Sequence, residues 1–165
     1  MGDDKGQRIE LILVKLGLLI KDNLLKAVEI LRKNPDKKLE QILIEEEIIT
    51  EFDYIRALGI KQGIALVNLA AQKISQKVLR YISEEVAREH SIIPVHETEY
   101  IMYIATSDPM DQVLFEHIGQ ISGKQISLLL ATKADINAAI DQNYIQQSVD
   151  NIMDEIEEQF GKDEE

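Results

Sequence analysis

The strongest constraint on the fold is an internal repeat in the N-terminal part of the chain. The stretches "RIELILVKLGLLIKDNLLKAV" (8–28) and "KLEQILIEEEIITEFDYIRAL" (38–58) align at a constant offset of 30 residues. Apolar residues recur at matching positions, among them Ile12/Ile42, Leu13/Leu43, Leu18/Ile48, Leu19/Ile49 and Ala27/Ala57. An apolar register kept over this length indicates a duplicated structural unit rather than chance.

Each copy of the repeat predicts two helices, because its apolar residues fall at helical spacing on either side of a short polar turn. Thr50 is the predicted N-cap in the second copy, with Asp53 three residues later, and Asp22 or Asn23 is predicted for the same role in the first copy. Pro35 predicts the end of the second helix. Two such hairpins predict a four-helix unit, since each is too small to be stable alone.

The pattern changes after residue 62 to one of alternating strands and helices. It predicts strands over 64–69, 91–98, 100–107 and 124–132, one helix or two abutting helices over 75–90, and helices over 109–122 and 133–144. This order is typical of a sheet of about three to four strands with helices on one face. The predicted class is therefore α+β, with a helical-hairpin subdomain at 1–62, a small α+β subdomain at 63–146 and an acidic amphipathic tail at 147–165.

Composition limits the partners of this 165-residue chain. Thirty acidic and eighteen basic residues give a net charge of −12, so nucleic acid and anionic membrane surfaces would repel it. No uncharged run is long enough to span a bilayer, and the acidic N-terminus lacks the basic-then-apolar order of a signal peptide. Cysteine is absent, which excludes disulfides and thiolate metal sites. We expect a cytoplasmic protein that neither inserts into membranes nor binds nucleic acid.

Two carboxylates three residues apart, Asp108 and Asp111, are the first candidates for chemistry. They either form a metal or acid–base pair, or they mark a corner in which Asp108 is the N-cap, Pro109 the first helical residue and Asp111 the third. No neighbouring histidine or carboxylate is placed by the sequence to complete a metal site. The corner is therefore the favoured interpretation.

Other catalytic signals are weak. The stretch "GQISGKQ" (119–125) has neither the glycine spacing nor the hydroxyl of a phosphate-binding loop, and it is interpreted as a helix end and turn. His90 is predicted to end a helix, where a cation suits the helix dipole. We predict no catalytic residue and no metal ligand, so the chain itself is not expected to be an enzyme.

Several motifs in a fixed order resemble those of a known family. They are Arg8, Leu13-Val14, Gly17-Leu18-Leu19, Leu24 and Val28 in the first copy, Leu39, Leu43-Ile44, Ile48-Ile49-Thr50-Glu51 and Ala57-Leu58 in the second, then "EEVAREH" (84–90), Pro94-Val95, "SDPMD" (107–111) and a closing strand and helix down to Tyr144. Together they resemble the N-terminal domain of type II secretion and type IV pilus assembly ATPases. This is the general secretory pathway protein E group, which includes the MshEN cyclic di-GMP receptor domains.

The resemblance implies a non-catalytic regulatory and docking domain. It implies partners in the ATPase domain of the full-length protein and in the inner-membrane platform protein, to which it would recruit the ATPase from the cytoplasmic side. The alternative that it implies is a cyclic di-GMP receptor with a degenerate motif, and no other cofactor. In that alternative the ligand-binding residues would be Arg8, Leu13, Gly17, Leu18, Lys38, Leu43 and Ile48.

Departures from the family pattern fall on the positions that the resemblance assigns to the ligand. Glutamate replaces glycine at Glu10, Glu40 and Glu47, lysine replaces the second arginine at Lys38, and Leu31 and Lys61 replace the closing glutamine. Glycine lets backbone N–H groups approach a ligand, whereas glutamate adds bulk and a charge of the same sign as the phosphates. Lysine lacks the flat bidentate geometry of guanidinium. These changes argue against tight binding of the dinucleotide.

The tail carries an apolar stripe at helical spacing, with acidic residues opposite. Its members are Val149, Ile152, Met153, Ile156 and Phe160. Either this helix folds back on its own domain or frays into solvent, or it is a linker to an ATPase domain or a docking helix for a partner.

Overall fold

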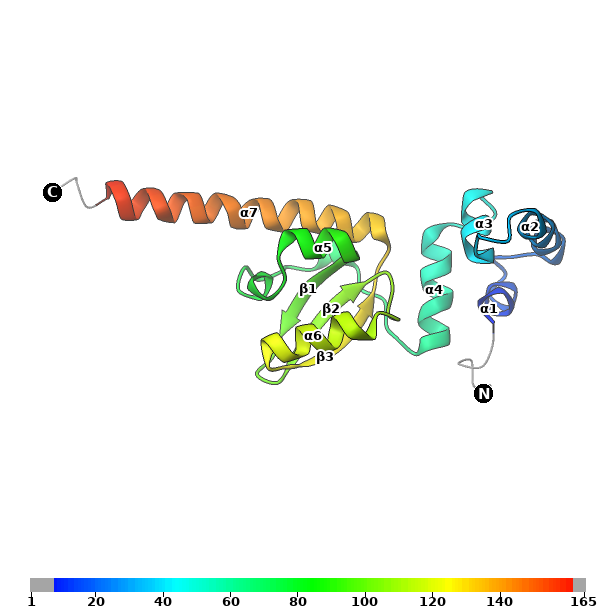
Figure 1. Cartoon of the computed structure of the whole chain (residues 1–165), viewed down its shortest axis with the longest axis horizontal. Helices are drawn as coiled ribbons and strands as arrows, with labels where there is room; N and C mark the ends of the chain where they lie inside the picture. Colours follow the sequence, from blue (N-terminus) through cyan, green and yellow to red (C-terminus); the bar gives the residue numbers. More distant parts are fainter. Residues whose placement is uncertain (1–7, 162–165) are drawn as a thin grey trace. The chain divides into compact units, whose positions relative to one another are not determined.

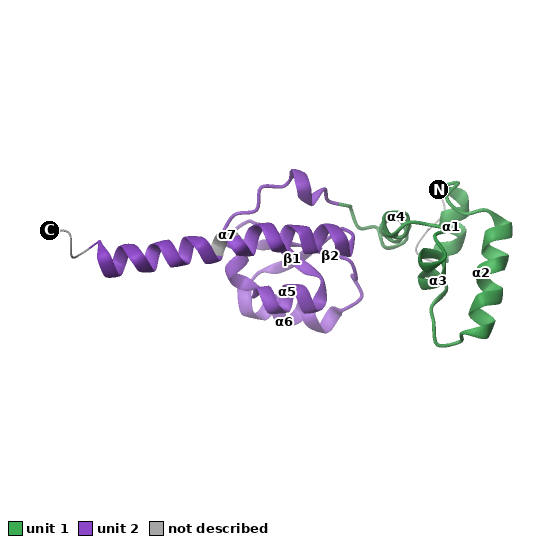
Figure 2. Ribbon diagram, turned by 90° about the horizontal axis from the view of Figure 1, so that it is seen from above, with its two compact units in different colours: residues 1–66 green, residues 67–165 purple. Residues whose placement is uncertain are grey.

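The computed structural model describes residues 8–161 and, for residues 146 and 147, the backbone alone. The chain divides into two compact units, residues 1–66 (unit 1) and 67–165 (unit 2), coloured separately in Figure 2. Each unit buries its own cluster of apolar side chains. The predicted α+β class is confirmed, since helices form unit 1 and unit 2 contains a three-stranded sheet with helices.

Unit 1 repeats its helices at the offset seen in the sequence. Its elements are α1 (Ile9–Lys15), α2 (Lys21–Lys33), α3 (Leu39–Glu45) and α4 (Glu51–Gln62). Helices α1 and α3 correspond residue for residue at an offset of 30, and α2 and α4 begin at equivalent positions. The duplicated pattern thus produces two copies of the same helix–turn–helix. Residues 1–7 of the predicted first subdomain lie outside the described part of the chain.

The core of unit 1 joins the two copies. Its matched buried pairs are Ile12/Ile42, Leu13/Leu43, Leu19/Ile49 and Ala27/Ala57. Helix α1 packs against α4, and α2 packs against α3, as Figure 1 shows. The main helix packing therefore runs between copies, so each copy covers the apolar face that the other exposes.

One of the two predicted N-caps in unit 1 is confirmed and the other is wrong. Thr50 caps α4 as predicted: its hydroxyl accepts from the Asp53 N–H at 3.0 Å, while the Asp53 carboxylate accepts from the Thr50 N–H. The predicted cap at Asp22 or Asn23 is wrong, because α2 begins after Ile20 and that side chain makes no capping bond. Its start is set by the turn that buries Leu19, at the position equivalent to Ile49. Helix α2 ends before Pro35, as predicted.

Unit 2 is built around a sheet in the order β1-β2-β3, with β1 and β2 antiparallel and β2 and β3 parallel. Helix α6 makes the connection that parallel strands require. The elements are η2 (Leu69–Ala71), η3 (Val78–Tyr81), α5 (Glu84–His90), β1 (Ile92–Glu97), β2 (Ile101–Thr106), α6 (Gln112–Ser122), β3 (Gln125–Leu130) and α7 (Lys133–Phe160).

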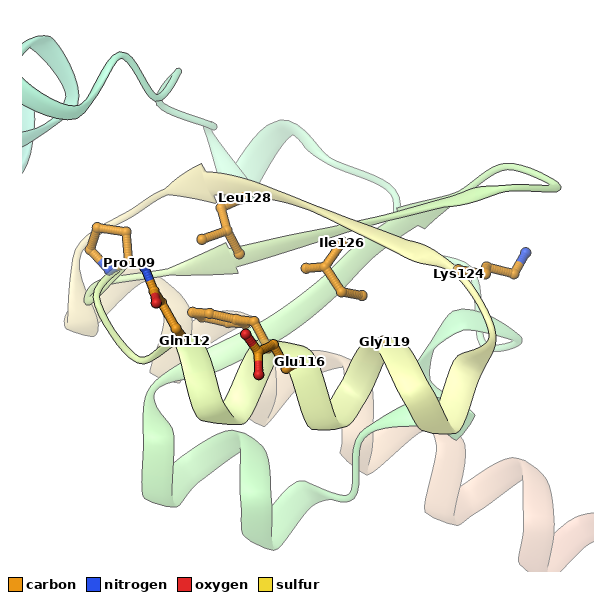
Figure 3. Close-up of a pocket in the computed structure, with 8 residues that line it drawn as sticks. Pro109, Gln112, Glu116, Gly119, Lys124, Ile126 and Leu128 are labelled. Atoms are coloured by element: carbon orange, nitrogen blue, oxygen red, sulfur yellow. The ribbon is translucent and has the colours of Figure 1, made fainter.

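The core of unit 2 lies between this sheet and its helices. Met102 and Ile104 of β2 are fully buried, as are Ile136 and Ile140 of α7. Figure 3 shows α6 on one side of the sheet, and α5 and α7 both contact β1. Alternate strand residues therefore meet the apolar stripes of the helices.

The segment before β1 differs from the prediction. The strand predicted over 64–69 is reduced to an isolated bridge at Leu66, and the Val67 N–H donates to the Leu130 carbonyl at 2.9 Å. The chain then turns into η2, because Leu69 is buried in the core instead of continuing along the edge of β3. The helix or helices predicted over 75–90 are two, η3 and α5, and the Ser83 hydroxyl caps the second.

Helix α7 is longer than predicted, since the predicted helix over 133–144 and the tail form one helix that ends at Phe160. Tyr144 is the last side chain of α7 that the structure shows to be buried, and its hydroxyl donates to the Ile82 carbonyl at 2.6 Å. Burial raises the pKa of the Tyr144 phenol. Residues 162–165 of the predicted tail lie outside the described part. Over residues 8–161, no helix is both long and apolar enough to cross a membrane.

Candidate functional site

The turns that follow α1 and α3 have the same backbone geometry. Gly17 has a φ of 75° and Glu47, at the equivalent position, has a φ of 57°. In the first copy the Gly17 N–H donates to the Val14 carbonyl and the Leu18 N–H to the Leu13 carbonyl. The second copy repeats both bonds one repeat later. This is the Schellman arrangement, in which the left-handed residue is normally glycine. Glu47 therefore holds a glycine conformation.

The predicted basic residues occupy the starts of the two equivalent helices. Arg8 is the N-cap residue of α1, and Lys38 is the N-cap residue of α3. The Arg8 Nε lies 3.3 Å from the Glu10 carboxylate, which itself stands where the family pattern has glycine. Because the Arg8 side chain is 78% exposed, this ion pair is weak. It still places a competing anion beside the one arginine that the motif retains.

The predicted apolar site residues separate into two groups. Leu13 and Leu43 are fully buried in the core of unit 1, so no ligand reaches them in this conformation. Leu18 and Ile48 are half-buried and follow the two left-handed turns. With Arg8, Gly17 and Lys38 they make up the predicted site residues that solvent reaches.

The corner around Asp108 and Asp111 is a turn followed by a helix. Asp111 is the N-cap of α6 and accepts from the Leu114 N–H at 3.3 Å, so the predicted assignment of that cap to Asp108 is wrong. The Asp108 carboxylate accepts from the Met110 N–H at 3.0 Å, which holds Pro109 and Met110 in a turn before the helix. The helix therefore begins three residues later than predicted.

The surroundings of this corner include a histidine but no metal cluster. His90 ends α5, as predicted, and its Nδ1 lies 3.7 Å from Asp111 Oδ2. Among the residues that the structure describes, no group of three or more histidine, aspartate or glutamate side chains is arranged to hold a metal ion. Both aspartates are engaged in backbone capping, which accounts for their presence.

A groove of about 410 Å³ lies between α6 and β3. Figure 3 shows Ile126 and Leu128 of β3 facing α6, with Lys124 at one end. Lys124 is already paired, since its Nζ lies 3.2 Å from Glu97 Oε2. Burial opposes ionisation of Glu97, but the interactions of its carboxylate with Lys124, Tyr81 and Arg80 outweigh burial and lower the pKa of the carboxyl. The groove thus combines an apolar wall with the carboxylate of Glu116 and an ion pair at one end.

Sequence reasoning did not find this groove, because its two walls come from separate elements. A weak signal was available in Gly119, where an added Cβ would lie 3.3 Å from the Lys124 carbonyl. The turn predicted over 119–125 is confirmed, with Gly123 left-handed at the end of α6.

The helical repeat and the small three-stranded sheet with its helices define a small α+β domain class. The chain belongs to the MshEN domain family, whose model matches residues 62–150. As a member it is a non-catalytic domain, in agreement with the prediction.

Two type IV pilus assembly ATPases are similar in sequence to this chain. The chain is 23% identical over 151 residues to the type IV pilus assembly ATPase PilB of Myxococcus xanthus, covering 90% of this chain and 26% of that protein. It is 25% identical over 140 residues to PilB of Thermus thermophilus, covering 84% of this chain and 16% of that protein. The chain thus spans about a quarter or less of the length of these relatives.

Solved structures share the fold. The structure described as MshE with cdg superposes with a TM-score of 0.70 at 20% identity, covering 84% of this chain and 99% of that chain. The N-terminal domain of XpsE superposes with a TM-score of 0.63 at 18% identity, covering 83% and 94%. The domain match over residues 62–150 confirms the predicted family, and these structures confirm its fold.

Proposed function

We propose that this chain is a regulatory and docking domain of a type IV pilus or type II secretion assembly ATPase. It recruits an ATPase domain of the same full-length protein to the inner-membrane platform protein, and so works at the cytoplasmic face of that membrane. The family match and the PilB relatives support the context. The match to the N-terminal domain of XpsE supports placing this chain in an N-terminal position of such a protein.

One observation carries this proposal: the repeat keeps the backbone geometry of the family motif, but several residues that would contact the dinucleotide are replaced. Both left-handed turns persist, but the second presents a carboxylate at Glu47. Arg8 is paired with Glu10, which replaces a glycine of the family pattern. A dianionic ligand would have to displace one carboxylate and approach another, whereas a protein partner needs only a folded surface.

Docking is tested by co-purification of the full chain with the cytoplasmic region of the platform protein. We expect a complex that elutes together in size-exclusion chromatography and resists moderate salt. An unrelated acidic domain of similar net charge controls for attraction by charge alone. Failure to form the complex, with both proteins folded, contradicts the proposal.

The second candidate is a cyclic di-GMP receptor, favoured by the fold match to the MshE structure described with cdg. Arg8, Gly17 and Lys38 are exposed and would contact the ligand, and the half-buried Leu18 and Ile48 would complete the site. Calorimetric titration of the full chain with cyclic di-GMP separates the two functions. We expect no heat at millimolar ligand. A micromolar dissociation constant that is lost in Arg8→Ala would make the receptor function the better account.

A further inference from the structure

The last four turns of α7 present an apolar face that unit 2 does not use. Its members, named here the α7 stripe, are Ile145, Val149, Ile152, Met153, Ile156 and Phe160. Apart from the adjacent pair Ile152 and Met153, they recur every three or four residues, which places all six on one side of the helix. Each is between 45% and 62% exposed. Single exposed apolar residues are ordinary, but a continuous row over four turns is typical of an interaction surface.

This part of α7 is also beyond the core of its own unit. Ile140 and Tyr144 are buried, and Asp141 pairs with Arg88 of α5 at 2.6 Å. After Tyr144, every side chain that the structure describes up to residue 161 is exposed. The predicted alternative in which the tail folds back on its own domain is therefore wrong. The helix keeps its form here without a packing partner, which a helix of this length rarely does on propensity alone.

The charges around the α7 stripe are all of one sign. Between residues 142 and 161 the sequence has no lysine or arginine and has five acidic residues, Asp150, Asp154, Glu155, Glu157 and Glu158. At 100° per residue, Asp150 and Glu157 border one side of the stripe and Glu155 borders the other. A second copy of this helix would bring five more carboxylates against these, and an anionic lipid surface would repel them.

We propose that the α7 stripe binds one amphipathic helix of a partner protein, whose apolar face is bordered by lysine or arginine. The apolar contact supplies the affinity, and the bordering charges supply orientation and selectivity. This inference deepens the docking role proposed above, since it names the docking surface and the chemistry of its partner.

The experiment uses a fluorescent helical peptide of about three heptads, with Leu at the a and d positions and Lys at e and g. A matched peptide carries Glu in place of Lys. Anisotropy titration with the full chain should give at least about tenfold tighter binding of the Lys peptide, and this preference should shrink with added salt. Equal affinities for the two peptides would overturn the charge argument.

Variants of the chain locate the binding surface. Ile152→Ala/Ile156→Ala should weaken the Lys peptide at least about tenfold, since it removes two central contacts and keeps a helix-forming residue at both positions. Asn151→Ala, on the opposite side of the helix, is the matched control and should leave binding unchanged. Both variants lie outside the core, and circular dichroism checks that helix content is retained. Undiminished binding by the double variant would sink the proposal.

Sedimentation of the full chain without peptide tests the competing occupant. A dimer that dissociates in Ile152→Ala/Ile156→Ala would assign the stripe to a second copy and overturn the inference, whereas a monomer supports it. The same variant separates this inference from the docking role. If it still co-purifies with the platform region, the docking role stands and the assignment to the stripe fails. If the native chain binds the Lys peptide but not the platform region, the assignment to the α7 stripe stands and the docking role fails.

Discussion

Glu47 shows at the scale of one residue how the two copies have diverged. It adopts the left-handed conformation that Gly17 adopts in the first copy, although a side chain there costs about 1 kcal/mol or more. We predict that Glu47→Gly stabilises the protein by about 1 kcal/mol. Urea unfolding followed by circular dichroism measures the change.

The equivalent turn supplies a matched control for this prediction. At Gly17 an added Cβ would meet no atom within 4 Å, so Gly17→Ala tests backbone strain without a steric clash. We expect a loss of about 1 kcal/mol there. If both substitutions left the free energy of unfolding unchanged, strain in these turns would not matter to stability.

The buried hydroxyl of Tyr144 allows a second prediction about stability. Its hydroxyl is the donor to a buried carbonyl, that of Ile82. We predict that Tyr144→Phe destabilises unit 2 by about 1–3 kcal/mol, because the carbonyl is left without this donor while the ring still packs. Thermal unfolding checks the loss. Tyr103→Phe, at a half-buried position for which the structure shows no hydroxyl bond of this kind, is the control and should have a smaller effect.

At the residue scale the sequence predicted caps well where one candidate stood alone. Thr50 with Asp53 had no competitor, and the structure confirms it. Asp108 and Asp111 can each cap a helix, and they lie on either side of Pro109. Which of them is the cap depends on the path of the chain between the end of β2 and the start of α6. The pairing of Arg8 with Glu10 was also beyond prediction, because a side chain two residues away on a helix end can point in several directions.

Equivalent helix starts allow a prediction at the scale of an element. Thr50 caps α4, whereas Ile20, at the same place before α2, offers no side-chain acceptor and is exposed. We predict that Thr50→Ala destabilises unit 1 by about 1 kcal/mol and that Ile20→Thr stabilises it by a similar amount. Urea unfolding of both variants measures the pair. An opposite sign for either would mean that the two starts are not equivalent in energy.

Most elements followed from periodicity, and the exceptions have physical causes. The two strands over 91–107 are rich in β-branched and aromatic residues, so the sequence predicted them. The helices of the repeat were predicted because its apolar residues recur at helical spacing. Residues 64–69 have the composition of a strand, but the structure shows an isolated bridge at Leu66, because the Ile64 N–H is used by the end of α4 and Leu69 turns into the core. The helix α7 was predicted as two segments that meet near residue 147, because its apolar pattern changes where the helix leaves the core of unit 2.

At the scale of the whole molecule, two separate cores predict separate responses to core mutations. Leu43 is fully buried in unit 1, and Ile104 is fully buried in unit 2. We predict that Leu43→Ala lowers the free energy of unfolding of unit 1 by about 2–5 kcal/mol, and that Ile104→Ala does the same to unit 2. Amide hydrogen exchange should show lost protection mainly in the unit that carries the change. Equal loss in both units would indicate one cooperative body.

Because the helices of the repeat pack mainly against helices of the other copy, the two copies cannot evolve independently in their interiors. Since α1 rests on α4 and α2 on α3, a gene that lost either half would encode helices with no complementary surface. Interior positions of the two halves are thus tied to each other, while the loops at their ends are not. Selection can rewrite one loop, as at Glu47, and leave its twin at Gly17 intact, so a duplicated framework is free to acquire two unlike surfaces.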